Sequence, residues 1–108
     1  TKFTIDVIKF ANKLGTLTVG ITNNVNSPLE NYAQIPILLD TGAEVVAGST
    51  RLKAGTAQKI CLNLISTLVM TRLGRVKKGM MNNLVVTNKK LSLRKKQIDL
   101  ILSKDKGI

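Results

Sequence analysis

The sequence predicts an α/β fold in which helices pack against a parallel β-sheet. Helical and strand-like patterns alternate along the chain, which is the order that such layered folds require. Only 3% of the residues are aromatic, so the core must be built mainly from Leu, Ile, Val and Ala. A chain of 108 residues has room for one domain at most.

The first half of the chain contains signals for two helices and two strands. Apolar residues at helical spacing predict a helix over 3–14, and Gly15 suits its C-terminal cap. A strand is expected over 17–22, followed by an asparagine-rich loop. Ser27 and Pro28 are typical of a helix start, and this short helix should end near residue 33. A second strand is expected over 35–39, near a sheet edge because it contains proline.

The second half is dominated by helices. Residues 40–48 read as a loop with room for one turn of helix. A long helix is expected over 50–72, and its apolar residues leave so little polar surface that it should be buried on most sides. Gly74 marks its end. Residues 75–86 read as an irregular link. Thr87 then caps a final helix over 88–103, whose lysines and arginines face mostly outward.

The organisation of these elements predicts that the chain is the C-terminal part of a larger domain. A parallel sheet of two strands would leave both edges open, and parallel sheets are normally larger and covered. The chain also begins on a helix, without a preceding strand or an initiator methionine. We expect residues 1–86 to be the C-terminal part of the α/β domain and residues 87–108 to be a C-terminal helix.

The composition narrows the possible chemistry and location. Cys61 is the only cysteine and lies in an apolar run, which favours a core residue in a reducing compartment. The chain has no histidine, which argues against the usual zinc sites and catalytic triads. Neither a secretory signal nor a membrane span is visible. We therefore expect a cytoplasmic protein without a membrane partner.

The formal net charge of +11 is unevenly distributed. Residues 1–50 are close to neutral, whereas the remainder carries fourteen lysines and arginines against two aspartates. Such a balance can mark nucleic-acid binding. The basic half offers no aromatic side chain on which a base could stack, so a solvated basic surface is the preferred interpretation. A nucleic-acid or other acidic partner stays the alternative.

The segment from Gly48 to Lys59 carries the clearest functional signal. It combines hydroxyls, cations and glycines at the expected start of the long helix. A helix N-terminus exposes unpaired N–H groups and the positive end of the helix dipole, which together favour an anion. The segment therefore predicts a phosphate or sugar-phosphate site. The candidate side chains are those of Ser49, Thr50, Arg51 and Lys53, although Ser49 could equally be a helix cap and the two cations could be solvated.

This segment, together with the preceding TGAEVVA at 41–47, resembles the bacterial N-acetylmuramic acid 6-phosphate etherases. These enzymes are members of the sugar isomerase (SIS) superfamily, to which the glucokinase regulatory protein is related. The resemblance continues upstream through LTVGITNN at 17–24 and downstream through LNLIST at 62–67 and RLGRV at 72–76. It implies a three-layer αβα, flavodoxin-like fold, of which this chain would hold the C-terminal portion. It covers the chain from residue 3 to about residue 98.

The resemblance implies a lyase that removes D-lactate from N-acetylmuramic acid 6-phosphate and leaves N-acetylglucosamine 6-phosphate. Proton abstraction beside a carbonyl and protonation of the leaving group call for paired carboxylates. The family's two catalytic glutamates would stand upstream of Thr1, so we expect no catalytic residue here and an inactive fragment. Thr1 would be the last residue of the phosphate loop. A homodimer, held largely by the long apolar helix, is also implied, and no metal or organic cofactor is.

Two site residues follow from the resemblance itself. Ser49 becomes the leading contact to the sugar phosphate. Glu44 matches an acidic position at the lip of the site, where it could either hold a sugar hydroxyl or orient the loop. The chain departs from the family pattern at Lys77, Lys78 and Lys89. A divergent relative, or a non-catalytic sugar-phosphate regulator like the glucokinase regulatory protein, stays the alternative function.

Overall fold

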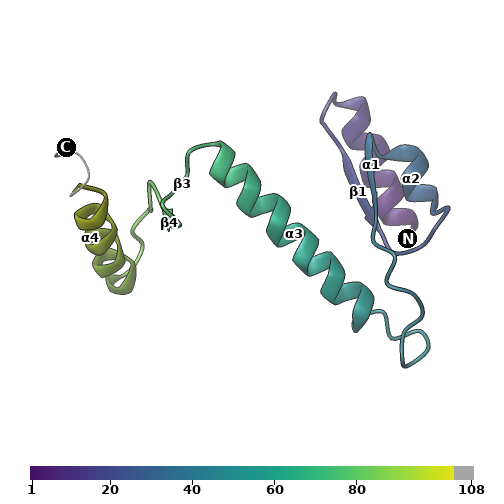
Figure 1. Ribbon diagram of the computed structural model, residues 1–108. Coiled ribbons are helices and arrows are strands. Elements are labelled where there is room, and N and C mark those ends of the chain that lie inside the picture. Colours follow the sequence, from purple (N-terminus) through teal and green to yellow (C-terminus); the bar gives the residue numbers. More distant parts are fainter. Residues whose placement is uncertain (104–108) are drawn as a thin grey trace. The chain divides into compact units, whose positions relative to one another are not determined.

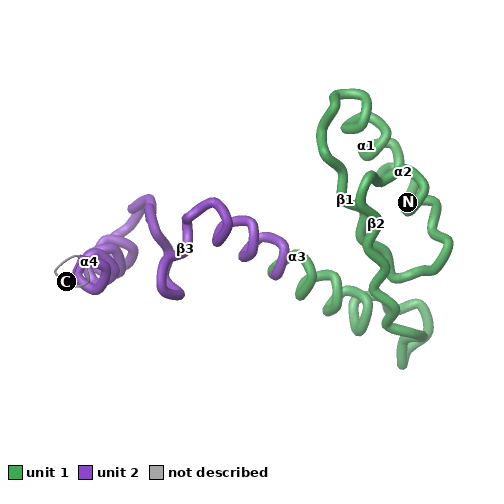
Figure 2. Tube along the Cα trace, turned by 45° about the horizontal axis from the view of Figure 1, so that its top comes forward, with its two compact units in different colours: residues 1–63 green, residues 64–108 purple. Residues whose placement is uncertain are grey.

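The computed structural model describes residues 1–103, which fall into two compact units. Unit 1 comprises residues 1–63 and unit 2 begins at residue 64; they are coloured green and purple in Figure 2. The elements, in chain order, are α1 (Lys2–Lys13), β1 (Val19–Thr22), α2 (Pro28–Tyr32), β2 (Ile35–Leu38), α3 (Lys53–Arg72), β3 (Val76–Lys77), β4 (Met80–Met81) and α4 (Lys89–Ser103), and Figure 1 traces them.

Unit 1 is built around the parallel pair of β1 and β2. Val19 pairs with Ile35 and Thr22 pairs with Leu38, so both strands end at the same edge. The helix α2 forms the connection between them, as a parallel pair requires. Ser27 caps this helix by accepting the N–H of Leu29 at 3.3 Å. The predicted α/β class and the order of the first four elements are confirmed.

The helix α2 packs directly on β1 because Gly20 has no side chain. A Cβ at this position would lie 2.7 Å from the Ala33 Cβ and 3.1 Å from the Leu29 Cγ. Both distances are shorter than ordinary van der Waals contact. Ile8 on α1 and Ala33, directly after α2, are buried apolar residues of this unit.

A buried threonine joins three elements of unit 1. Thr18 is only 6% exposed, and its hydroxyl donates to the Asn12 Oδ1 at 2.7 Å. The same hydroxyl accepts the N–H of Gln34 at 3.1 Å. The Asn12 amide in turn donates to the Tyr32 carbonyl at 2.7 Å. The end of α1, the start of β1 and the end of α2 are therefore fixed together by hydrogen bonds.

The long helix begins later than the sequence predicted, at Lys53 rather than Thr50. Gly48 has a φ of 78°, in the left-handed region that glycine adopts most easily. Tight turns follow, in which the N–H of Thr50 bonds to the Gly48 carbonyl and the N–H of Leu52 bonds to the Ser49 carbonyl. Helical geometry starts only after these turns, so Ser49 is not the helix cap.

The expectation that α3 is buried on most sides is wrong for this chain. Ala54 is its one buried residue, whereas Ile60, Leu64 and Leu68 are 55%, 57% and 62% exposed. Apolar residues lie all around this helix, so covering them needs packing partners on several sides. Over the described residues, the strand ends reach only the first turns of the helix, through Gln58.

Unit 2 contains a β-hairpin where the sequence predicted an irregular link. The strands β3 and β4 are antiparallel, and Lys78 and Gly79 between them have φ values of 53° and 72°. Two consecutive residues with positive φ are typical of a type I′ hairpin turn. Gly74, with a φ of 70°, follows the end of α3 as expected.

The final helix is capped by a different residue from the one predicted. The Asn88 Oδ1 accepts the N–H of Leu91 at 2.9 Å, so Asn88 rather than Thr87 caps α4. Ile98 is the buried residue of this helix, and its lysines and arginines are exposed, as predicted. Residues 104–108 of the expected C-terminal helix lie outside the described residues. The proposed division at residues 86 and 87 stays a prediction.

Candidate functional site

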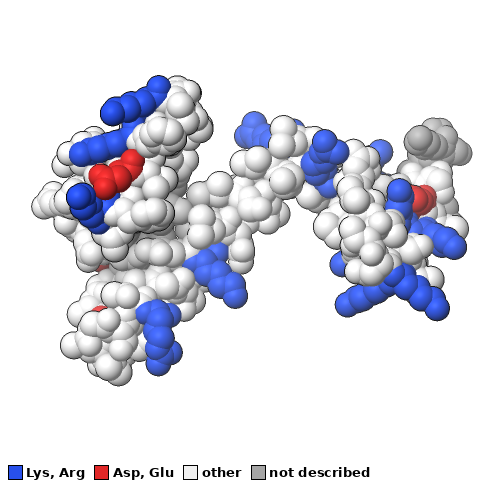
Figure 3. Space-filling model, turned by 180° about the vertical axis from the view of Figure 1, so that it is seen from behind, with Lys and Arg blue, Asp and Glu red and all other residues white. Residues whose placement is uncertain are grey.

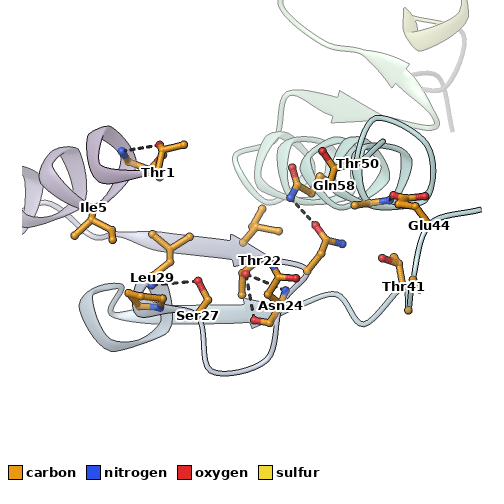
Figure 4. Close-up of a pocket in the computed structure, with 17 residues that line it drawn as sticks. Thr1, Ile5, Thr22, Asn24, Ser27, Leu29, Thr41, Glu44, Thr50 and Gln58 are labelled. Atoms are coloured by element: carbon orange, nitrogen blue, oxygen red, sulfur yellow. Dashed lines mark hydrogen bonds between the residues drawn. The ribbon is translucent and has the colours of Figure 1, made fainter. Parts of the chain in front are cut away.

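A polar cavity of about 800 Å³ lies in unit 1 at the carboxyl ends of its two strands. In open α/β sheets this edge is where ligands bind. Figure 4 shows the cavity with Thr22 and Asn24 at the end of one strand and Gln58 reaching down from α3. Its lining comes from the start of α1, the end of β1, the start of α2, the loop after β2 and the first turns of α3: Thr1, Thr4, Ile5, Ile21, Thr22, Asn23, Asn24, Ser27, Pro28, Leu29, Thr41, Gly42, Ala43, Glu44, Thr50, Ala54 and Gln58.

The floor of the cavity is shaped by a tight turn after β1. Thr22 is 7% exposed, and its hydroxyl oxygen lies 3.2 Å from the Asn24 nitrogen and 3.3 Å from the Asn24 carbonyl oxygen. These bonds turn the backbone sharply at the strand end (Figure 4). The side chain of Asn24 is exposed at this turn and lines the cavity. The turn therefore brings an amide group to the edge where a ligand would lie.

Glu44 binds the N-terminus of α3 across a sequence separation of nine to ten residues. Its Oε2 accepts the N–H of Lys53 and its Oε1 accepts the N–H of Ala54, both at 2.9 Å. The N–H groups of Ala54 and Lys53, and to a smaller extent the positive charge of Lys53, hold the pKa of the Glu44 carboxyl below its usual value. The anion at this helix start is thus supplied by the protein itself.

The next N–H groups of α3 also have hydrogen-bond acceptors within the protein. The N–H of Gly55 bonds to the Thr50 carbonyl at 2.8 Å, and that of Thr56 bonds to the Leu52 carbonyl at 3.2 Å. A Cβ on Gly55 would approach the same Thr50 carbonyl to 3.2 Å, which explains glycine at this position in the helix. A ligand could use the helix start only by displacing Glu44.

The five predicted site residues are therefore placed differently. Glu44 and Thr50 line the cavity, whereas Ser49, Arg51 and Lys53 are not among its lining residues. Arg51 and Lys53 are exposed, and Ser49 is half-buried within the turns before α3. Contact of any of these side chains with a ligand stays a prediction.

Sequence reasoning missed several residues that the cavity brings together. Thr4, Asn24, Ser27, Thr41 and Gln58 carry polar side chains and line it. Asn24 and Thr41 stand shortly after predicted strands, and parallel strands end at a shared edge. Their position after predicted strands could therefore have identified Asn24 and Thr41. Nothing local in the sequence marks Thr4 or Gln58.

The described residues include no group of three or more His, Cys, Asp or Glu side chains that could hold a metal ion. Cys61 is half-buried on α3. Within the same residues, no helix has both the length and the apolar character needed to cross a bilayer.

Unit 2 presents a basic surface. In the face that Figure 3 shows, lysine and arginine side chains are scattered over this unit among uncharged residues, with little acidic surface among them. On α4 these are Lys89, Lys90, Arg94, Lys95 and Lys96, all exposed, and the acidic residue of this helix is Asp99.

The fold and the cavity of unit 1 define an α/β protein with a cavity at the carboxyl ends of parallel strands, the edge where proteins of this class bind ligands. No protein-family profile matches the chain. The chain is, however, 49% identical over 98 residues to the N-acetylmuramic acid 6-phosphate etherase of Oceanobacillus iheyensis. It is 47% identical to the etherase of the same name from Bacillus cereus and 46% identical to that from Bacillus anthracis.

These matches cover 91% of this chain and 33% of each relative. The chain thus spans about one third of the length of the curated relatives that it matches. The resemblance to N-acetylmuramic acid 6-phosphate etherases that the sequence predicted is confirmed.

Proposed function

We propose that this chain forms part of the sugar-phosphate site of a carbon–oxygen lyase. The lyase would cleave the D-lactyl ether of N-acetylmuramic acid 6-phosphate, giving N-acetylglucosamine 6-phosphate and D-lactate in amino sugar catabolism. The observation that carries the proposal is the polar cavity at the strand ends, in a chain 49% identical to a curated etherase. The fold would be the C-terminal portion of a SIS domain in a cytoplasmic enzyme.

The chemistry of the cavity suits a sugar phosphate. Its lining includes the hydroxyls of Thr4, Ser27, Thr41 and Thr50, which can bond to sugar hydroxyls and phosphate oxygens alike. Backbone segments from several elements converge on the same space, as ligand sites in α/β proteins commonly do. Three residues close to Thr50 in the chain are proposed as further substrate contacts: Ser49, Arg51 and Lys53.

Glu44 is not proposed as a catalytic base. Both of its carboxylate oxygens accept backbone N–H groups, which stabilises the charged form and lowers its readiness to take a proton. Of the two roles open to it, orienting the loop is the one that its hydrogen bonds support. The paired carboxylates of an elimination would therefore come from elsewhere in the enzyme.

We also propose that the enzyme is a homodimer in which α3 contributes to the interface. Ile60, Leu64 and Leu68 recur every four residues and so share one face of the helix, and each is more than half exposed. An exposed apolar stripe of this kind is typical of an interaction surface. Sedimentation equilibrium of a complete etherase carrying this sequence tests this: a Leu64→Lys variant should shift the dimer towards monomer, while Lys59→Glu should not.

A chimaera tests the enzymatic proposal. The 98 matched residues of this chain would replace the corresponding third of the Oceanobacillus iheyensis etherase. The chimaera should release D-lactate from N-acetylmuramic acid 6-phosphate, whereas the 108-residue chain alone should not. A Thr50→Val change in the chimaera should weaken binding of N-acetylglucosamine 6-phosphate about tenfold, in line with the loss of one buried hydrogen bond.

The outcomes separate the alternatives. A folded chimaera that binds N-acetylglucosamine 6-phosphate and releases no lactate would favour a non-catalytic regulator like the glucokinase regulatory protein. Lactate release by the 108-residue chain alone would contradict the proposal that the catalytic groups lie elsewhere. A folded chimaera with neither binding nor activity would overturn the proposed function.

A further inference from the structure

Asn23 connects three parts of the cavity wall through one side chain. Its Nδ2 donates to the Leu39 carbonyl at 2.9 Å, directly after β2. Its Oδ1 accepts from the Gln58 Nε2 at 2.6 Å, in the second turn of α3 and 35 positions further along the chain. Asn23 itself stands at the end of β1, so its amide links both strand ends to the helix.

The two bonds fix which way each amide group points. The Leu39 carbonyl can only accept, so the Asn23 nitrogen must face it. The Asn23 oxygen then faces Gln58, which must present its own nitrogen. Aspartate could keep only one of these bonds, because a carboxylate has no N–H to donate.

The loop of residues 40–52 forms part of the cavity wall and lies between these two attachment points. Asn23 holds the chain directly before this loop, at Leu39, and in the second turn of the helix that follows it, at Gln58. Inside the loop, Glu44 holds the first N–H groups of α3. Glu44 and Thr50, which line the cavity, therefore stand between the two attachment points of Asn23.

We propose that Asn23 is a positioning residue that sets the loop of residues 40–52, and with it the sugar-phosphate site. The proposal rests on the proposed function for the identity of the ligand. It assigns to Asn23 no contact with the ligand itself. Its effect passes through Gln58 and the start of α3 to the residues that line the cavity.

Hydrogen exchange of backbone amides in the 108-residue chain tests whether Asn23 sets the loop of residues 40–52. An Asn23→Ala change should speed exchange at Lys53, Ala54 and Gly55 about tenfold or more, because the loop and the helix start open more often. Gln58→Leu should have a similar effect, and the double variant should add little to either single change. The matched control is Asn24→Ala, which removes the same side chain from the neighbouring position and should leave these rates unchanged.

Ligand affinity tests whether the position of this loop also sets the sugar-phosphate site. In the etherase chimaera, Asn23→Ala should weaken the affinity for N-acetylglucosamine 6-phosphate about tenfold while the chain stays folded by circular dichroism. Asn23→Asp, which keeps the bond from Gln58, should fall between Asn23→Ala and the parent. Unchanged exchange rates in a folded Asn23→Ala chain would overturn the proposal. Faster exchange with unchanged affinity would overturn the link between the loop and the site.

The design separates failure of the two proposals. If the parent chimaera binds no N-acetylglucosamine 6-phosphate, the proposed function fails, and the exchange rates decide whether Asn23 positions the loop. If the parent binds and the Asn23 variants bind equally well, the positioning role fails and the proposed function stands.

Discussion

Unit 1 and unit 2 are held together in different ways. In unit 1, side-chain hydrogen bonds join residues that are far apart in the sequence, such as Asn12 to Tyr32 over 20 positions and Asn23 to Gln58 over 35. Among the described residues of unit 2, Asn82 bonds to the Gly74 carbonyl over eight positions and Leu91 to Asn88 over three. Long-range bonds fix distant elements against one another, whereas these bonds act over a short stretch of the chain.

This difference explains where the candidate site is found. The large polar cavity lies in unit 1, where elements from several parts of the chain converge and are held in register. Unit 2 contains a hairpin, the capped helix α4 and a basic surface. Substitutions that remove one contact should therefore cost more in unit 1 than in unit 2.

The largest effect is expected at Gly20. A Gly20→Val change would force a side chain into the Ala33 Cβ, which a Cβ alone would approach to 2.7 Å. Separating α2 from β1 should lower the free energy of unfolding by about 3 kcal/mol, measured by urea denaturation. The control is Gly15→Asn, where no atom lies within 4 Å of the added Cβ and where asparagine tolerates the φ of 70°. Equal stability of the two variants would contradict the packing described here.

A smaller effect is expected from a matched pair of threonines, one in each unit. Thr18→Val removes a buried hydroxyl that both donates and accepts, and should destabilise the chain by about 2 kcal/mol. Thr71→Val removes an exposed hydroxyl that bonds to the Thr67 carbonyl of its own helix, and should change stability by less than about 0.5 kcal/mol. Denaturation of both variants under the same conditions compares the two units directly. A greater loss of stability from Thr71→Val than from Thr18→Val would contradict this difference between the units.

A change at the cap of α4 tests whether the loss of one contact in unit 2 has only a local effect. Asn88→Ala should destabilise α4 by about 1 kcal/mol, because the Leu91 N–H loses its acceptor. Thr87→Ala is the control and should have no measurable effect. Chemical shifts of α4 amides would report the change, and those of unit 1 should not move. A response in β1 or α2 would contradict the local role of this cap.

Much of unit 1 could be predicted because its signals are local. Ser27 and Pro28 mark the start of α2, and Gly15 follows the end of α1 with a positive φ. Such residues act on the neighbouring backbone, so a short stretch of sequence contains the whole argument. The parallel sheet followed from the order of the elements.

The remainder depends on contacts that no short stretch contains. Gln58 belongs to the cavity wall only because it meets Asn23, which stands 35 positions earlier. The sequence predicted that the N-terminus of α3 binds the anion of a ligand. Its first N–H groups bind the carboxylate of Glu44 instead. The hairpin was missed because Lys78 takes a positive φ that lysine rarely adopts, so its turn lacks the usual asparagine or aspartate.

The smallest effect is expected from the ionisation of Glu44. Because backbone N–H groups bind its charged form, its pKa in the folded chain should lie below the ordinary value of 4.5. The unfolded chain would then bind a proton at higher pH than the folded chain does. The stabilising contribution of Glu44 is therefore fully present above about pH 4.5 and is lost as the pH falls through the lower, folded pKa.

Titration of the Glu44 side chain by NMR would measure this pKa directly. In a Glu44→Gln variant, the amides of Lys53 and Ala54 should lose the pH dependence that the parent shows in the acid range, and they should exchange faster at neutral pH. Glu30→Gln, on α2, is the control and should leave both amides unchanged. The effect on overall stability should be slight because Glu44 is partly exposed and solvent screens its charge. A Glu44 pKa at or above 4.5 would mean that its carboxylate does not hold the start of α3 in solution, and that this helix start is free to receive the anion of a ligand.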